Sequence, residues 1–224
     1  MKRIIIAIDG PAASGKSTSA KLLARKLGYV YLDTGAMYRA CALAAQQQQI
    51  NINDIQALSR LMENIRIHIQ FSDHGNTIWL NDDDVSEAIR EPDISRLASA
   101  ISAHRVVRTK MVKLQRELGR EGGVILDGRD IGTVVFPQAE LKFFMIAPLK
   151  IRAQRRYLEL KEKGLNPVFE DILQDLVNRD KADASRALAP LIPAEDAIEI
   201  DTGELTIAEQ VEKLYRIYLE KVGS

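Results

Sequence analysis

Hydrophobic positions at the start of the chain alternate between two spacings. Residues 4–8 form an unbroken aliphatic run, which is typical of a strand buried on both faces of a parallel sheet. Apolar residues then recur at helical spacing from Ala20 to Leu27. A second apolar run at residues 29–32 and a helical stretch over 35–45 repeat this order. The alternation predicts an α/β fold with a doubly wound parallel sheet.

The spacing changes in the next part of the chain. Asn53 or Asp54 can cap a helix with apolar residues at helical intervals. Isoleucines then alternate with polar residues, and turn-forming residues precede a second short apolar run. This antiparallel pattern, at about residues 63–90, predicts an insertion into the series of strands and helices. Its predicted parts are a strand at 65–70, a turn at 73–76 and a return strand at 77–80.

The alternation of strands and helices resumes after the insertion and completes about five parallel strands in one domain, residues 1–224. Thr206 and Glu209 form a capping box at the start of the last helix. The predicted buried stripe of that helix is Ile207, Val211, Leu214 and Tyr218. The other predicted elements are a helix around residues 107–118, strands at 123–127, 141–146 and 197–200, and helices near Lys150 and around 169–177.

Composition narrows the possible partners. The 224 residues include 31 Lys and Arg and 31 Asp and Glu, so the net charge is close to zero. Proteins that bind nucleic acid polymers usually carry a basic excess, so we expect no such partner. Cys41 is the single cysteine, and we interpret it as a small buried helix residue. No apolar stretch has membrane-spanning length or the form of a signal peptide, so we expect a soluble cytoplasmic protein with no membrane partner.

A glycine-rich motif follows the first predicted strand and matches the phosphate-binding pattern G-x-x-x-x-G-K-[ST]. Its glycines let backbone N–H groups turn toward a polyphosphate, and the following helix adds its positive N-terminal end. Lys16 can reach the β- and γ-phosphates, and the Ser17 hydroxyl can coordinate Mg²⁺. This P-loop, which predicts an ATP site with magnesium, is Gly10-Pro11-Ala12-Ala13-Ser14-Gly15-Lys16-Ser17.

The P-loop leaves the phosphoryl acceptor open. A switch GTPase would need a guanine-reading N-K-x-D stretch after a later strand, and the sequence has none. An ATP-driven motor or sensor would usually be larger or carry a partner-binding module. These exclusions favour a small kinase, with a nucleotide-binding regulatory protein as the alternative from a different class.

Further motifs resemble one family of kinases. The second strand ends in Asp-Thr-Gly-Ala-Met-Tyr-Arg (33–39), and the third in Asp-Gly-Arg-Asp followed by Ile-Gly-Thr-Val-Val-Phe-Pro (127–137). Together with the P-loop, these motifs closely resemble bacterial cytidylate kinases, from residue 3 to near 220. The resemblance implies a P-loop core at about 1–62, 91–148 and 167–224, a nucleoside-monophosphate-binding (NMP-binding) insertion at about 63–90, and a helical lid at about 149–166.

By this resemblance, the acceptor is CMP or dCMP. Arg39 and Arg129 would hold its phosphate, because planar guanidinium groups can bind phosphate oxygens in pairs. Asp130, helped by Ser99, would accept a hydrogen bond from the cytosine amine, and Arg108 would donate to N3 and O2. Uracil reverses the polarity at positions 3 and 4, so the carboxylate would discriminate against UMP. The implied CMP-binding residues are Thr34, Tyr38, Arg39, Ser99, Arg108, Asp127, Arg129, Asp130, Arg179 and Arg186.

Arginines in the last third of the chain complete the expected site. Arg179 and Arg186 lie on one face if their helix is continuous. The resemblance assigns Arg179 to the acceptor sugar and Arg186 to both phosphates, while a helix salt bridge from Arg179 to Asp175 is the alternative. Three more arginines lie at i, i+3 and i+4, and beside a P-loop core we interpret them as a lid over ATP. They are Arg152, Arg155 and Arg156.

The expected reaction is in-line transfer of the ATP γ-phosphoryl group to CMP or dCMP, giving ADP and CDP or dCDP. Such a transfer depends on positioning and charge and needs no nucleophilic side chain. Asp33 is expected to hold a magnesium-bound water or to orient Arg129. A shikimate-type or uridylate-accepting kinase is the nearest alternative, and the resemblance suggests a monomer. The predicted catalytic residues are Lys16, Arg129, Arg186 and Asp33. Ser17 is the predicted Mg²⁺ ligand. The predicted ATP-binding residues are Gly10, Pro11, Ala12, Ala13, Ser14, Gly15, Lys16, Ser17, Thr18, Arg152, Arg155 and Arg156.

Overall fold

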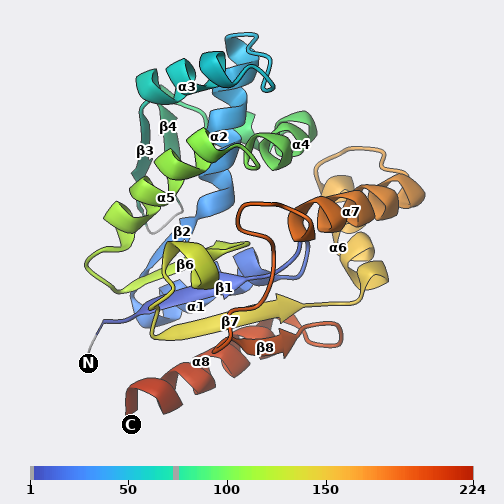
Figure 1. Ribbon diagram of the computed structural model, residues 1–224. Helices are drawn as coiled ribbons and strands as arrows, with labels where there is room; N and C mark the ends of the chain where they lie inside the picture. The colour runs from blue at the N-terminus through green and yellow to red at the C-terminus, as the bar shows by residue number, and fades with distance from the viewer. Residues whose placement is uncertain (1–2, 73–75, 224) are drawn as a thin grey trace.

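The computed structural model describes residues 3–72 and 76–223, and a parallel sheet forms its centre (Figure 1). The five strands follow the order β2-β6-β1-β7-β8, which confirms the predicted parallel sheet. Asp9 lies opposite Gly128, and Asp33 lies opposite Asp127. The carboxyl ends of the strands therefore meet at one edge, where open α/β sheets bind ligands. The strands are β1 (Ile5–Asp9), β2 (Val30–Asp33), β6 (Val124–Gly128), β7 (Leu141–Ile146) and β8 (Ile198–Asp201).

Alternating side chains of the sheet contribute to two hydrophobic cores. Ile6 and Ile8 pack in one core with residues of α1 (Lys16–Leu27) and α8 (Ile207–Gly223), and Ala7 between them belongs to the other. Figure 1 shows α8 on the opposite side of the sheet from α2 and α5. Among the described residues, no helix combines the length and apolar character needed to cross a membrane. The second core includes residues of α2 (Thr34–Gln47), α3 (Ile55–Asn64), α4 (Pro92–Ile101) and α5 (Arg105–Gly119).

A separate antiparallel sheet lies beside α2 (Figure 1), as the alternating isoleucines predict. Its strand β3 (Ile67–Gln70) pairs with β4 (Thr77–Leu80), and a short strand β5 (Asp83–Asp84) follows. The prediction missed β5 and a 3₁₀ turn (Ala88–Arg90), which are too short to show a period, and it also missed α4. In the predicted turn, residues 73–75 lie outside the described part of the chain.

Asp54, and not Asn53, caps α3, because its carboxylate accepts hydrogen bonds from the N–H groups of Gln56 and Ala57 at 3.1 and 3.0 Å. The capping box of α8 is also present. The N–H of Thr206 donates to the Glu209 carboxylate at 2.8 Å, and the N–H of Glu209 donates back to the Thr206 hydroxyl at 3.3 Å. Both helix starts therefore follow local sequence signals.

Two predictions about helix faces need correction. Helix α7 (Phe169–Ala184), which packs on α6 (Leu149–Glu162), ends before Arg186, so Arg186 and Arg179 do not share a helical face. The chain turns away there because the N–H of Leu191 bonds back to the Asp183 carbonyl at 2.9 Å.

In α8, Ile207 is 36% exposed, although it was expected to be buried. Gln210 is fully buried instead, one turn before Leu214. Its amide is satisfied inside the protein, because it accepts a hydrogen bond from Ser19 at 2.9 Å and donates to the Leu205 carbonyl at 3.0 Å. A polar residue can therefore occupy the buried stripe at this point.

Candidate active site

The P-loop joins the end of β1 to the start of α1 at the carboxyl edge of the sheet. At Gly10, a Cβ atom would lie 2.2 Å from the Met145 carbonyl oxygen, so the loop can follow this path only with glycine. The Lys16 side chain is buried, and its Nζ donates to the Pro11 carbonyl at 3.0 Å. Burial, and then the Arg129 charge, lower the pKa of Lys16 to about 7, while Asp127 acts in the opposite direction. The loop thus holds a desolvated cation ready to meet a phosphate.

Oxygen atoms suited to a hard cation lie at the P-loop serine. The Ser17 hydroxyl donates to Oδ2 of Asp127 at 2.5 Å, and the Tyr31 hydroxyl donates to Oδ1 at 2.8 Å. Burial, and then the Asp33 charge, raise the pKa of Asp127. Mg²⁺ prefers oxygen ligands and commonly keeps waters and substrate phosphates in its shell. The donor set at Ser17 and Asp127 therefore fits Mg²⁺, although no group of three or more His, Cys, Asp or Glu residues in the described chain forms a closed cage.

Asp33 contacts Arg39, which the sequence did not indicate. Its Oδ2 accepts from Arg39 at 2.8 Å, and its Oδ1 accepts from the N–H of Ala36 at 2.9 Å, capping α2. Burial opposes ionisation of Asp33, but Arg39 and this N–H hold its pKa below the usual value. The expected alternative partner, Arg129, instead donates to Asp183 at 2.7 Å.

Asp183 joins two of the predicted site arginines, and sequence reasoning missed it. Its two carboxylate oxygens accept from Arg129 and Arg186. Its side chain is 1% exposed, yet these arginines hold its pKa below the usual value against the effect of burial. The spacing i, i+3 between Asp183 and Arg186 is a signal that could have indicated the pair.

Arg179 is half-buried beside this cluster, and its Nε atom is buried. Burial, and then the Arg129 charge, lower its pKa to about 10, and its Nε has no hydrogen-bond partner among the described residues. No ion pair joins it to Asp175 in residues 3–72 and 76–223, so the simple helix salt bridge does not account for it. A buried donor without a partner is expected where a ligand completes the site.

A second buried pair lies at the other end of the arginine cluster. Arg108 donates to the Asp130 carboxylate, and both side chains are almost fully buried. Burial raises the pKa of Asp130, and Arg108 opposes that effect. The Tyr38 ring lies 5.9 Å from the Arg108 guanidinium, and its hydroxyl has no partner among the described residues. Thr34 donates to the Asp127 carbonyl at 2.7 Å, which joins this pocket to β6.

One cleft of about 1250 Å³ connects these parts. All of the predicted site residues line it except Gly10, Pro11 and Arg152. Arg152 donates to the Asp180 carboxylate at 3.1 and 2.6 Å and to the Ala12 carbonyl at 3.3 Å, so it ties α6 to α7 and the P-loop. The expected face of three lid arginines is therefore divided, and only Arg155 and Arg156 reach the cleft.

Arg155 donates to the hydroxyl and carbonyl of Thr202 at 3.0 and 2.5 Å, and Arg156 pairs with Glu159 at 2.7 Å. Both arginines are thus held by neighbouring residues while they line the cleft. Their role over ATP, like the roles of the other site residues, stays a prediction.

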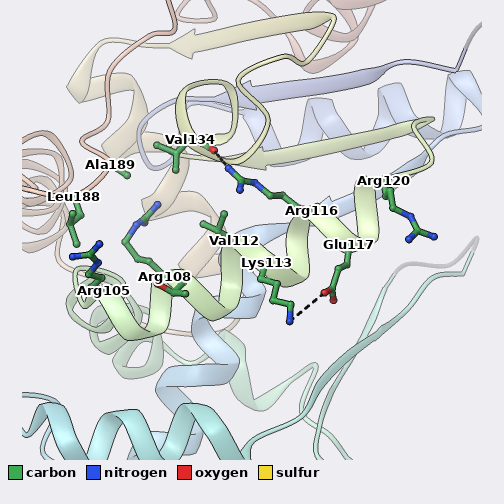
Figure 2. A pocket seen from close by; sticks show the side chains of 11 residues that line it. Arg105, Arg108, Val112, Lys113, Arg116, Glu117, Arg120, Val134, Leu188 and Ala189 are labelled. Atoms are coloured by element: carbon green, nitrogen blue, oxygen red, sulfur yellow. Dashed lines mark hydrogen bonds and ion pairs between the residues drawn. The ribbon is translucent and has the colours of Figure 1, made fainter.

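A second groove, of about 750 Å³, runs along α5 (Figure 2). Figure 2 shows Arg116 reaching from α5 to the backbone near Val134. Its Nε and Nη2 donate to the carbonyls of Val135 and Val134 at 2.9 and 2.8 Å. Lys113 pairs with Glu117 at 4.0 Å in the same groove. Arg116 therefore braces the segment that follows Asp130.

The family model described as cytidylate kinase matches residues 6–220. The chain belongs to the cytidylate kinase family. This confirms the family that the motifs predict. Among similar proteins, a cytidylate kinase of Bacillus anthracis is 48% identical over 218 residues, which cover 97% of each chain. A cytidylate kinase of Bacillus cereus is 48% identical over 216 residues, or 96% of each chain.

Solved structures that resemble this cytidylate kinase family member support the fold alone. A crystal structure of a Thermus thermophilus protein has a TM-score of 0.50 at 21% identity and covers 99% of this chain and 98% of its own. An uncharacterized protein from Eubacterium ventriosum has a TM-score of 0.51 at 14% identity and covers 97% of this chain and 99% of its own.

Proposed function

We propose that this protein transfers the γ-phosphoryl group of ATP to CMP or dCMP, producing ADP and CDP or dCDP. The observation that carries this proposal is a single cleft with a P-loop on one side and five buried or half-buried arginines on the other. Such a cleft can hold a triphosphate and a monophosphate face to face. The family of the chain agrees with this arrangement. The arginines are Arg39, Arg108, Arg129, Arg179 and Arg186.

ATP enters this scheme with its triphosphate on the P-loop N–H groups and Lys16. Ser17 and Asp127 would hold Mg²⁺, which would neutralise part of the charge of the phosphates. Because the γ-phosphate must face Arg129, the adenosine extends the opposite way along the cleft. That end is lined by Arg155 and by the start of α8, around residues 205–210.

The acceptor site selects cytosine through a buried carboxylate. Asp130 accepts from the cytosine amine, and Arg108 donates to the ring acceptors of the base. UMP would place its O4 oxygen against the Asp130 carboxylate and leave buried groups unsatisfied, at a cost of about 1–3 kcal/mol for each group. Arg39 and Arg129 hold the acceptor phosphate, and Asp183 orients Arg129 and Arg186 together.

Catalysis in this site consists of positioning and charge stabilisation. The acceptor phosphate oxygen lies in line with the γ-phosphoryl group, while Lys16, Arg129 and Arg186 stabilise the charge on the transferring oxygens. Arg155 and Arg156 on α6 close over ATP and exclude water. We propose that the protein works as a cytoplasmic monomer without a nucleic acid or membrane partner. The equal numbers of basic and acidic residues support the absence of a nucleic acid partner.

An acceptor panel tests the proposal. Purified protein, ATP and magnesium are combined separately with CMP, dCMP, UMP and shikimate, and ADP release is followed. CMP or dCMP should give the fastest release. Preference for UMP or shikimate would favour another kinase, and ATP binding without any acceptor-dependent release would favour a regulatory protein.

Lys16→Ala supplies the catalytic control for this panel. It should remove most turnover and leave the circular dichroism spectrum unchanged, because Lys16 acts on phosphate charge. Lys26→Ala on the same helix is the matched variant, since Lys26 pairs with Glu212 at the surface and should keep normal turnover. Near-normal turnover of Lys16→Ala would contradict the assignment.

A further inference from the structure

A single wide helical turn follows directly after Arg129 and Asp130. This π-turn (Ile131–Val135) has i to i+5 hydrogen bonds, with the N–H of Val135 bonded to the Asp130 carbonyl at 3.2 Å and that of Phe136 to the Ile131 carbonyl at 2.7 Å. The first N–H groups of any helical turn lack partners within the turn. Their partner therefore decides how the turn, and the two residues before it, are oriented.

Asp9, at the end of the neighbouring strand β1, provides that partner. Its Oδ1 accepts from the N–H of Ile131 at 2.9 Å, and its Oδ2 accepts from the N–H of Gly132 at 2.8 Å. Asp9 ends β1, is 5% exposed and directly precedes Gly10 of the P-loop. One carboxylate thus joins the base of the P-loop to the base of the π-turn.

Burying this carboxylate is unfavourable in itself. Burial, with Asp130 as a further repulsive charge, raises the pKa of Asp9 to about 7, although the two N–H groups and Lys16 oppose the shift. An apolar residue would avoid this desolvation cost but would leave the two N–H groups unsatisfied. The carboxylate therefore stabilises one specific backbone geometry, although burial makes its charged form less favourable.

Arg116 holds the opposite end of the same turn (Figure 2), where it donates to the carbonyls of Val134 and Val135. The π-turn is consequently fixed at its N-terminal end by Asp9 and at its C-terminal end by Arg116. Arg129 and Asp130 lie immediately before this clamped turn. The clamped turn therefore helps to set the position of their backbone relative to the P-loop.

We propose that Asp9 is a positioning residue for acceptor recognition, which sets Arg129 and Asp130 relative to the P-loop by capping the π-turn. The inference rests on the proposed function, because it assumes that Asp130 contacts the acceptor base. Asp9 itself does not line the cleft. Its loss should therefore weaken use of the acceptor and its selectivity, while the triphosphate remains bound by the P-loop.

Asp9→Asn is the decisive variant, because it keeps the shape but presents an NH₂ group to one of the two backbone N–H donors. We expect kcat/KM for CMP to fall about 10-fold or more, as for loss of one buried hydrogen bond. The ratio of kcat/KM for CMP to that for UMP should fall as well, and KM for ATP should stay within about twofold. Asp54→Asn, which alters a carboxylate cap on α3 far from the π-turn, is the matched control. It should change neither kcat/KM for CMP nor the ratio of kcat/KM for CMP to that for UMP.

The proposal would be overturned if kcat/KM fell equally for CMP and UMP, because a merely structural role does not alter selectivity. A rise in KM for ATP as large as the fall in kcat/KM for CMP, or unchanged kinetics, would overturn it as well. If Asp9→Asn does not fold, Arg116→Gln decides, because it loosens the other end of the turn from an exposed position. It should also lower the ratio of kcat/KM for CMP to that for UMP. An unchanged ratio would show that clamping the turn does not position Arg129 and Asp130. Failure of the wild-type protein to phosphorylate CMP would instead reject the proposed function, before any variant is compared.

Discussion

In the protein without nucleotide, the surroundings of Lys16 disfavour its positive charge. Its ammonium is buried, and Arg129 and Arg179 lie near enough to lower its pKa further. Asp127 and Asp33 act in the opposite direction without restoring the ordinary value. The site therefore stores electrostatic repulsion that a triphosphate relieves, which links ligand affinity to the instability of the empty site.

This repulsion predicts that Lys16→Met stabilises the nucleotide-free protein. The folded pKa of Lys16 is about 7 against an ordinary 10.5, so the unfolded chain binds the proton more tightly between these values. Wild-type stability should therefore rise with pH across this window, and the destabilising effect of Lys16 is complete below about pH 7. Relative to wild type, the variant should show its largest gain in thermal midpoint below pH 7 and a shrinking gain toward pH 10.5. Adding ATP should not raise the thermal midpoint of the variant further.

Thermal unfolding followed by circular dichroism, on both sides of pH 7 and with and without ATP, measures these effects. Lys26→Met is the control, because Lys26 lies at the surface and should change the midpoint little. A Lys16→Met protein that melts below wild type at every pH would show that the buried ammonium is a net stabiliser.

At the scale of elements, the P-loop depends on how closely it packs on neighbouring backbone. Gly10 approaches the Met145 carbonyl of β7, and Gly15 approaches the Gln210 amide of α8, where an added Cβ would lie 2.6 Å from Oε1. Gln210 also bonds to Ser19 on α1 and to the loop before α8. The loop is thus held by elements from both ends of the chain.

Gly10→Ala should therefore destabilise the protein far more than a change of backbone conformation alone would. We expect a loss in the free energy of unfolding of about 3 kcal/mol or more, because the clash is with backbone and cannot be relieved by a rotamer change. Gly28→Ala measures the cost of a positive φ without a clash, since Gly28 has φ of +64°, compared with +152° at Gly10, and no atom within 4 Å of a Cβ. It should cost about 1–2 kcal/mol. Urea unfolding compares the two, and equal losses would rule out the packing explanation.

At the scale of the whole molecule, an ion pair helps to attach α6, the proposed lid helix, to α7. Arg152 of α6 binds Asp180 of α7 and the P-loop carbonyl of Ala12. The same two helices carry Arg155, Arg156 and Arg179 into the cleft. Motion of α6 relative to the P-loop should therefore be coupled to α7, and so to the acceptor arginines.

Asp180→Ala tests this attachment. It removes the carboxylate partner of the buried Arg152 guanidinium, which keeps the Ala147 and Ala12 carbonyls, so we expect a loss of about 1–3 kcal/mol in the free energy of unfolding. We also expect slower CMP phosphorylation and faster ATP hydrolysis without acceptor, because a loosened lid admits water. Glu212→Gln, in an exposed pair with Lys26, should change stability by about 1 kcal/mol or less and leave both rates unchanged. An Asp180→Ala enzyme with normal rates would show that the pair serves stability alone.

Local signals account for the parts of this protein that were predicted correctly. Aliphatic runs gave the parallel strands, the alternating isoleucines gave the antiparallel insertion, and Asp54 and Thr206 marked helix starts. Each signal acts over a few neighbouring residues. The buried place of Gln210 and the end of α7 before Arg186 were missed, because both depend on hydrogen bonds that are not apparent from helical spacing.

The amino-acid sequence by itself determined the order of strands and helices, the phosphate-binding loop and the supply of arginines. These follow from side-chain periodicity and from a short motif whose chemistry is contained in its own residues. Only the tertiary structure decided which carboxylate meets which donor, as in Asp183 with Arg129, 54 residues apart, and Asp9 with Ile131, 122 residues apart. Such partners are brought together by the packing of the sheet and its helices, and sequence spacing carries no direct record of that packing.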